Sequence, residues 1–408
     1  MSPNIESIRR SDELQEKTTQ YLQFKSNIHQ KIMNSEDEYT KRKQRLLDYF
    51  NGTEDDWENW HWQMKNRIQD VATLSLFVDL STTDYNEIAR VVKHNRFAIV
   101  PYYVAIASRD IHHPVNMLSI PRVAEIVDTT GYDDPMAEEF TNPAGSITRR
   151  YPDRLIINVT NICAMYCRHC QRRRLIGESD HHTPVEIINE SIEFIRNHPE
   201  IRDVLLTGGD ALLLSDHQLE SILQQLRAIP HVEIIRIGSR TPVTMPMRIT
   251  PELVQMIKQY HPVYLNTHYN HPYELTTRSM KACEVLANHG IVVGNQAVLL
   301  RGINDDPYIM TYLNQRLLQA RVRPYYLFHA KSVKGTSHFI PSLSRGLEIM
   351  DFMRGFTSGL AIPTYIMNAP GGLGKVPLLP QYIVNKSKNT YTIRTWEDKT
   401  FEYADSEY

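Results

Sequence analysis

From about Arg154 onward, the chain alternates short runs rich in β-branched residues with amphipathic helical segments. This alternation is typical of βα units, in which a helix carries the chain back so that successive strands run parallel. Several runs have the length and composition of such strands: RLIINV, DVLLT, VEIIRIG, VYLNT, IVVGNQAVLL, YYLF and AIPTYIM. The pattern predicts an α/β fold with a barrel or partial barrel of parallel strands, and a doubly wound sheet is the competing architecture.

Between the predicted strands, apolar residues recur at helical spacing. In one segment Ile188, Ile192 and Ile195 fall on one helical face. Pro184 suits the first turn of that helix, and Thr183 is its expected N-cap. These segments are the expected return helices of the βα units.

The rest of the chain has a different composition. Residues 5–50 are highly charged with scattered apolar positions, which predicts solvated helices that pack on another part of the protein. The stretch Asp56–Ile68 holds three of the four tryptophans, which is typical of a core or interface helix. We therefore expect a mainly helical region over 1–150, the barrel over 151–367, and a C-terminal loop and tail over 368–408.

Charge and hydropathy exclude some partners. The net charge of −2 over 408 residues gives no basic surface for nucleic acid. The most apolar run, Phe97–Ala107, is too short to cross a bilayer, and the N-terminus lacks the apolar core of a signal peptide. We expect a cytoplasmic protein without nucleic-acid or membrane partners.

Chemistry in such a barrel sits on the loops that follow the strands, because the strand C-termini meet at one end. Several candidate residues occupy those places. They are Cys163 after RLIINV, Gly208, Gly209 and Asp210 after DVLLT, His268 after VYLNT, Lys331 after YYLF and Asn368 after AIPTYIM.

Three of the four cysteines, Cys163, Cys167 and Cys170, lie within eight residues. In a reducing compartment such a cluster indicates metal binding or catalysis rather than disulfides. A structural zinc site takes four ligands, so a zinc site would have to recruit the distant Cys283 or His169. A cubane iron–sulfur cluster held by three thiolates leaves one iron open to another ligand.

A second motif, NAPGGLGK, ends in Lys375. A phosphate-binding P-loop needs Ser or Thr after its lysine, whereas Val376 and Pro377 follow here. A lysine on a glycine-rich loop can instead form a Schiff base with pyridoxal phosphate, since that role requires a flexible amine and close backbone approach.

Together the motifs resemble the lysine 2,3-aminomutase family of the radical S-adenosylmethionine superfamily, over about Trp57 to Tyr382. The motifs are RYPDR, CAMYCRHCQRRR, LLTGGDALL, RIGSRTPV, LNTHYNHP, GNQAVLLRGIND, RPYYLF and PGGLGK. The resemblance implies a partial (βα)6 TIM-like barrel with an N-terminal helical region and a C-terminal extension. It implies an isomerase that moves an amino group from C2 to C3 of an amino acid. The implied cofactors are a [4Fe–4S] cluster, S-adenosylmethionine and pyridoxal phosphate.

The resemblance also implies roles for individual residues. Cys163, Cys167 and Cys170 would hold the cluster, and the turn Gly208, Gly209 and Asp210 would contact the methionine amino group of S-adenosylmethionine. Lys375 would bind pyridoxal phosphate covalently, in a site lined by Tyr151, Arg154 and His268. Arg172 would clamp the substrate α-carboxylate, a task suited to a guanidinium fork. An electron donor such as a flavodoxin or ferredoxin, and a homo-oligomer, are implied as well.

Two positions depart from the lysine-specific members of the family. Those enzymes place aspartates around the distal ammonium of the substrate, and the matching positions here are Lys331 and Asn368. A lysine cation repels an ammonium, whereas a cation together with an amide donor complements a carboxylate, so we expect L-glutamate as substrate and β-glutamate as product. A lysine 2,3-aminomutase with unusual recognition is the alternative.

A function of another class is an iron–sulfur regulatory or RNA-binding protein on a retained barrel, against which Lys375 argues. No zinc is expected, because Asp306 and the tail FEYADSEY stand where some lysine enzymes carry zinc-binding cysteines. Phe328 occupies a position where the lysine enzymes carry a tyrosine.

Overall fold

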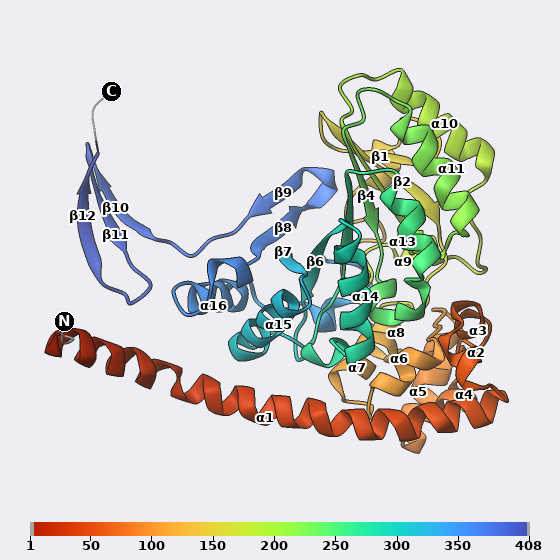
Figure 1. Ribbon diagram of the computed structural model, residues 1–408, viewed down its shortest axis with the longest axis horizontal. Helices are drawn as coiled ribbons and strands as arrows, with labels where there is room; N and C mark the ends of the chain where they lie inside the picture. The colour runs from red at the N-terminus through yellow and green to blue at the C-terminus, as the bar shows by residue number, and fades with distance from the viewer. Residues whose placement is uncertain (1–3, 406–408) are drawn as a thin grey trace.

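The computed structural model describes residues 4–405, and the end of the tail motif, 406–408, lies outside them (Figure 1). One sheet follows chain order, from β1 through β9. Strands β2 to β8 run parallel, and each overlaps one of the runs predicted as strands. They are Arg154–Thr160, Asp203–Gly208, Ile234–Gly238, Val263–Thr267, Val292–Leu299, Arg323–His329 and Thr364–Ala369. Because the order never reverses, the sheet is a partial barrel and the doubly wound alternative is excluded.

Short antiparallel strands flank the parallel ones. At one edge β1 (Ile147–Arg149) pairs with β2, and at the other β9 (Gly374–Pro377) pairs with β8. The sheet therefore begins before residue 151 and ends beyond residue 367. Sequence reasoning missed both strands, since each is too short for a two-residue period to be read.

Helices follow the parallel strands and cover the outside of the curled sheet (Figure 1). They are α10 (Val185–Arg196), α11 (Asp216–Arg227), α13 (Pro251–Lys258), α14 (Thr277–Asn288), α15 (Pro307–Gln319) and α16 (Leu343–Met353). The predicted apolar face of α10 is buried. The N-cap prediction is wrong: Pro184 is the N-cap residue of α10, and the Thr183 hydroxyl donates to the Asn158 carbonyl at 2.8 Å.

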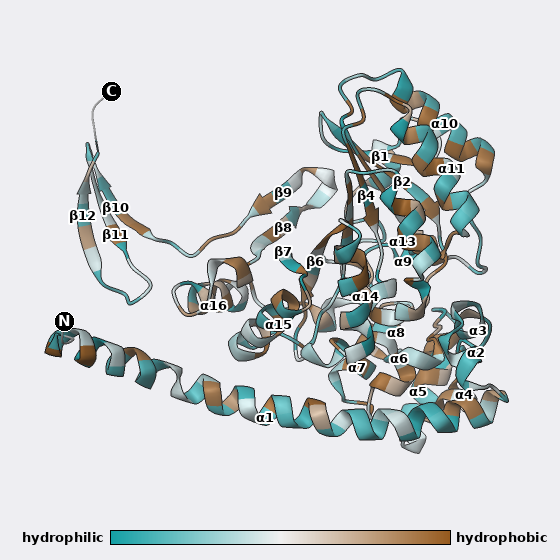
Figure 2. Ribbon diagram, in the orientation of Figure 1, coloured by the Kyte–Doolittle hydropathy of each residue, from teal (hydrophilic) through white to brown (hydrophobic). Residues whose placement is uncertain are grey.

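The N-terminal region begins with one helix, α1 (Ile5–Phe50), where several were expected. No glycine or proline interrupts this stretch, and Asn51 ends it in the left-handed conformation. Its C-terminal half packs on the body through Leu46 and Leu47. Figure 2 shows hydrophilic residues interspersed with hydrophobic ones along the ribbon of this helix.

Short helices join α1 to the sheet. They are α2 (Glu54–Glu58), α3 (Trp60–Lys65), α4 (Val71–Ser75), α5 (Thr82–Val92), α6 (Pro101–Ile106), α7 (Pro114–Ser119) and α8 (Ala124–Val127). Trp57 is fully buried among them, as the tryptophan-rich segment predicted. Just before α6, the Val100 N–H donates to the Ala164 carbonyl at 3.2 Å and the Tyr166 N–H donates to the Ala98 carbonyl at 3.1 Å. The helical region thus holds the cysteine-bearing loop in place.

The tail forms a separate three-stranded antiparallel sheet, β10 (Ile383–Ser387), β11 (Thr390–Arg394) and β12 (Thr400–Ala404). It lies beside the N-terminal end of α1 (Figure 1), where Arg10 and Lys17 form ion pairs with Glu397. In the part of the chain that the structure describes, no helix is both long and apolar enough to span a bilayer.

Candidate active site

The C-terminal ends of the parallel strands surround a cavity of about 280 Å³. Its walls come from the loop after β2, the ends of β3 to β8, and the loop that leads into β9. The structure brings together there Cys163, Cys167, Cys170, Arg172, Gly208, Gly209, Asp210, His268, Lys331, Asn368 and Lys375. Two further predicted residues do not line the cavity: Tyr151 lies against Lys375, and Arg154 stacks on Tyr151, as described below.

Each of the three clustered cysteines is free and partly buried. Burial raises the pKa of the Cys163 thiol and of the Cys170 thiol. Among the described residues, no three Cys, His, Asp or Glu side chains converge on a point that could hold a single ion. In a cubane cluster each thiolate binds a different iron, so the three sulfurs need only face one cavity. The three cysteines line one cavity, and this arrangement fits a cluster.

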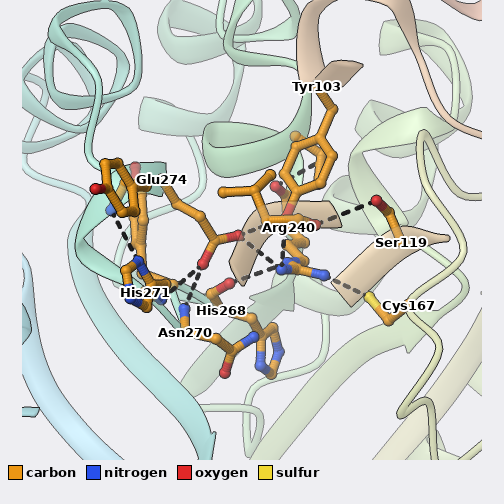
Figure 3. A network of polar contacts seen from close by, with 12 residues as sticks. Tyr103, Ser119, Cys167, Arg240, His268, Asn270, His271 and Glu274 are labelled. Atoms are coloured by element: carbon orange, nitrogen blue, oxygen red, sulfur yellow. Dashed lines mark hydrogen bonds and ion pairs between the residues drawn. The ribbon is translucent and has the colours of Figure 1, made fainter. Parts of the chain in front are cut away.

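One arginine that sequence reasoning did not single out, Arg240, contacts a cluster cysteine. It follows β4 in the motif RIGSR, and its Nη1 donates to Sγ of Cys167 at 2.6 Å (Figure 3). Its Nε donates to the His268 carbonyl at 3.0 Å, and its Nη2 donates to Glu274 at 2.7 Å and to the Tyr103 hydroxyl at 3.3 Å. Glu274 has no exposed surface and accepts two backbone N–H groups as well. This network fixes the guanidinium beside the sulfur.

The glycine turn after β3 packs against the cysteine loop. Gly208 has φ +126°, and a Cβ there would overlap the Thr160 carbonyl oxygen; a Cβ at Gly209 would overlap that of Ile162. Only glycine allows this approach. The neighbouring Asp210 is buried, which raises the pKa of its carboxyl. This carboxyl accepts from the Ser239 hydroxyl at 2.6 Å and so fixes the turn.

Lys375 stands on β9 directly opposite Asn368 on β8. The Lys375 side chain is reachable from the cavity, and its amine lies 5.4 Å from the Tyr151 ring and 5.8 Å from the Tyr326 ring. The Tyr151 hydroxyl accepts from the Lys375 N–H at 3.0 Å, and the Arg154 guanidinium stacks 3.9 Å from the Tyr151 ring.

The surroundings of this amine suit a lysine that binds pyridoxal phosphate. Loss of hydration, assisted by the cations Arg236, Arg150 and Arg154, lowers the pKa of Lys375 to about 8. The Nη1 of Arg150 is buried without a hydrogen-bond partner in the described chain. A guanidinium N–H group without a partner, beside a reactive amine, fits a ligand that carries a phosphate.

His268 is partly buried at the cavity wall. Its Nδ1 lies 2.8 Å from the Gln296 carbonyl, which can only accept, so Nδ1 carries the proton. Burial, with the nearby Arg240, Arg172 and Lys331, lowers the pKa of His268 to about 4. The imidazole is therefore neutral, and its Nε2 is an acceptor.

Lys331 follows β7 and lines the same cavity. Loss of hydration and the cations Arg172 and Arg150 lower the pKa of Lys331 to about 7. Its amine lies 5.9 Å from the Phe328 ring, which gives Phe328 a place as an apolar wall beneath the cation. The Nδ2 of Asn368 is buried without a partner among the described residues. Both groups thus remain available to a ligand.

Arg172 lines the cavity, and it is held by Glu138, which sequence reasoning missed. Glu138 lies in an irregular segment outside the recognised motifs, so no periodicity or spacing marks it. By contrast, Arg150 begins the motif RYPDR and Arg240 ends the motif RIGSR. A charged residue within a recognised motif could have marked both as candidate site residues.

Comparisons with known proteins agree with these features. A sequence model of the Radical SAM superfamily matches residues 157–313, and one described as Lysine-2,3-aminomutase matches residues 350–408. The chain is 56% identical over 400 residues to glutamate 2,3-aminomutase of Clostridioides difficile, covering 98% of this chain and 94% of that protein. It is 48% identical over 359 residues to L-lysine 2,3-aminomutase of Fusobacterium nucleatum, covering 88% and 84%.

Among solved structures, Streptococcus suis SuiB bound to S-adenosylmethionine matches with a TM-score of 0.40 and 10% identity, covering 53% of this chain and 51% of that one. The sequence matches identify an isomerase of the aminomutase class. Its cofactors are a [4Fe–4S] cluster, S-adenosylmethionine and pyridoxal phosphate. The chain belongs to the lysine 2,3-aminomutase family of radical S-adenosylmethionine enzymes.

Proposed function

We propose that this chain interconverts L-glutamate and β-glutamate by moving the amino group between C2 and C3. The observation that carries the proposal is the pair Lys331 and Asn368, whose side chains line the cavity that also holds Arg172 and Lys375. The relative from Clostridioides difficile, named as a glutamate 2,3-aminomutase, supports the same substrate.

Charge favours glutamate over lysine in this cavity. The ammonium of a lysine substrate would face the Lys331 amine, and one of the two charges would remain unpaired at a cost of several kcal/mol. The γ-carboxylate of glutamate would accept from Lys331 and from the unpartnered Asn368 Nδ2. Since Arg172 and Arg150 lower the pKa of Lys331, a second carboxylate also relieves the repulsion among these cations.

The residues divide the work of binding and orientation. Cys163, Cys167 and Cys170 would hold the cluster, and Lys375 would anchor pyridoxal phosphate. Hydrogen abstraction and amino-group migration are the chemistry that the bound groups supply. The lowered pKa of Lys375, about 8, leaves a larger neutral, nucleophilic fraction of its amine near neutral pH.

Substrate anchoring follows from two contacts. Arg172 would bind the α-carboxylate, while Lys331 and Asn368 would bind the distal carboxylate. Fixing both ends of a five-carbon chain fixes C2 and C3 between them. The rings of Tyr326 and Phe328 line the cavity beside these groups and would exclude water from a reactive carbon.

The wider setting belongs to the same proposal. The three expected regions, 1–150, 151–367 and 368–408, would supply the helical support, the cluster site and the pyridoxal phosphate lysine. A flavodoxin or ferredoxin would deliver the electron, the active form would be a homo-oligomer, and the thiolates would require a reducing, cytoplasmic location.

The test is an anaerobic assay. The cluster is reconstituted, pyridoxal phosphate, S-adenosylmethionine and dithionite are added, and L-glutamate and L-lysine are followed separately by NMR. We expect β-glutamate alone. Formation of β-lysine alone would contradict the proposed substrate and favour the lysine enzyme. The Lys375→Ala variant is the control: it should lose both the visible absorption of bound pyridoxal phosphate and turnover, and wild-type protein without that absorption would favour a regulatory role.

A further inference from the structure

The Arg172 guanidinium is hydrogen-bonded to Glu138 along one edge. Its Nε lies 3.2 Å from both carboxylate oxygens of Glu138, and its Nη2 lies 3.0 Å from Oε1. Glu138 is only 7% exposed, in the short 3-10 helix Glu138–Thr141. Burial opposes its charge, but Arg172 and Arg150 outweigh burial and lower the pKa of this carboxyl. Glu138 is therefore an ionised, buried partner of Arg172.

A guanidinium offers two edges for bidentate pairing with a carboxylate, Nε with Nη2 and Nη1 with Nη2. Glu138 occupies the first edge. No hydrogen bond within residues 4–405 uses Nη1 of Arg172, which lines the cavity. Because Glu138 fixes the plane of the guanidinium and Arg172 lines the cavity, the Nη1–Nη2 edge is the one left for a ligand.

We propose that Glu138 is a positioning residue that holds Arg172 by its Nε–Nη2 edge and so presents the Nη1–Nη2 edge to the substrate α-carboxylate. This inference rests on the proposed function, because it assumes that Arg172 binds the carboxylate of an amino acid.

The segment that carries Glu138 is itself fixed on two sides. Ala137, the residue before it, adopts the left-handed conformation with φ 49°, which sets the direction in which the chain enters the 3-10 helix. On one side Asp134 pairs with Arg174 at 2.9 Å, on the helix that follows Arg172. On the other side the Gly371 N–H donates to the Pro135 carbonyl at 3.1 Å, in the loop that leads to Lys375.

This placement links the two ends of the proposed site. A Cβ at Gly372 would come within 2.8 Å of the Met136 carbonyl oxygen, so the Lys375 loop and the Glu138 segment touch closely. Arg172 and the Lys375 loop therefore both contact the short segment that carries Glu138. These contacts hold the Glu138 carboxylate in a fixed position.

Glu138 also acts on Lys331, whose protonation governs the other end of the substrate. The groups that bear on the Lys331 amine are Arg172, Arg150 and Lys375, which lower its pKa, and Glu138, which raises it. Removing the Glu138 charge should therefore reduce the protonated fraction of Lys331 at neutral pH. A role in packing alone would have no such effect.

The experiment compares Glu138→Gln with wild type on whichever amino acid the wild type converts. We expect KM to rise about tenfold while kcat changes by less than about threefold, because an oriented binding contact is lost. With glutamate as substrate, KM should rise with pH as Lys331 loses its proton, and this rise should begin at a lower pH in Glu138→Gln than in the wild type. Glu138→Asp, which keeps the charge, should recover part of the affinity. Glu139→Gln, the same change at an exposed neighbour, is the matched control and should behave as wild type.

The outcomes separate the two proposals. If the wild type converts only lysine, the proposal that glutamate is the substrate is wrong. The effect of Glu138→Gln on the KM for lysine still tests whether Glu138 positions Arg172. If the wild type is active and neither Glu138 variant changes KM, the positioning role is wrong. If Glu138→Gln binds no pyridoxal phosphate or unfolds at a lower temperature, Glu138→Asp becomes the deciding variant. A crystal structure of Glu138→Asp shows whether its shorter carboxylate still pairs with the Nε–Nη2 edge of Arg172. Wild-type KM and pH dependence in a variant that has lost this pair would overturn the proposal.

Discussion

Asn368 and Lys375 are direct partners across the antiparallel pair of β8 and β9, so their side chains leave the same face of the sheet. One strand pairing therefore sets the relative position of two groups: the residue proposed to bind the distal end of the substrate, and the lysine proposed to anchor the cofactor. A slip of β9 by one residue would turn the Lys375 side chain to the other face, away from Asn368. Several measurable consequences follow from this and from the charges around it.

Substrate choice should follow the charge of the distal site. We expect the double variant Lys331→Asp with Asn368→Asp to lose at least about a hundredfold in kcat/KM for L-glutamate, since a carboxylate would then face carboxylates. L-lysine turnover should rise above that of the wild type. NMR with each amino acid measures both. Lys334→Asp, on an exposed neighbour of the same loop, is the control, and an unchanged preference in the double variant would contradict the role of this pair.

Glutamate binding should weaken above neutral pH. The pKa of Lys331 is about 7 in the free site, and a bound carboxylate raises it, so binding takes up a proton. KM for glutamate should therefore increase by up to about tenfold per pH unit from pH 7 to the pKa of the complex, and be flat below pH 7. Steady-state assays from pH 6 to 9 would measure this. Lys331→Arg, whose charge does not titrate, should remove this dependence, and a dependence that persists in it would assign the titration to another group.

The hydrogen bond from Arg240 to Cys167 should raise the reduction potential of the cluster, because donors to the sulfurs and positive charge favour the reduced state. Removing Arg240 alone would leave Glu274 buried and unpaired, so the informative change is Arg240→Gln together with Glu274→Gln. We expect a more negative midpoint in an EPR-monitored titration of the reconstituted protein. Arg227→Gln, distant from the cysteines, should leave the midpoint unchanged. The same midpoint in the double variant would show that this contact does not tune the cluster.

Gly208 should be intolerant of any side chain. Gly208→Ala combines a φ of +126° with overlap against the Thr160 carbonyl, so β3 and the cysteine loop must move apart, at a cost of about 1–3 kcal/mol. We expect a lower thermal midpoint and less iron per chain after reconstitution. Gly359→Ala, where a Cβ meets nothing within 4 Å, is the control. Full iron content in Gly208→Ala would mean that the turn and the cysteine loop are not coupled.

The sequence predicted the parallel part of the sheet well. Runs such as VYLNT, which is β5, Val263–Thr267, carry the β-branched and apolar composition of buried strands, and the helices between them carry a clear period. Because strand ends gather at one edge, the positions of Cys163, His268 and Lys331 after strands were enough to predict a shared cavity. The same argument could not say which side chains contact each other there.

What the sequence did not predict depends on single contacts. Thr183 is a good N-cap by residue type, yet its N–H donates to the Val159 carbonyl and its hydroxyl to the Asn158 carbonyl, so it stays beside β2 and Pro184 is the N-cap residue. Glu138 is one acidic residue among many in the sequence, and only its contact with Arg172 in the folded chain marks it as part of the site. The division into 1–150, 151–367 and 368–408 stays a prediction, although β1 and β9 extend the sheet beyond its middle part.

The pairing of Arg10 and Lys17 with Glu397 has a practical consequence for handling this protein. Glu397 lies in the turn between β11 and β12, and the Lys17 amine also lies 4.9 Å from the Trp396 ring. The N-terminal part of α1 and the tail sheet therefore contact each other, so a truncation that removes Arg10 and Lys17, or one that removes Glu397, takes a partner away from the other segment. Protein trimmed at one end should be compared with protein trimmed at both, because neither end can be treated as a separate, dispensable appendage.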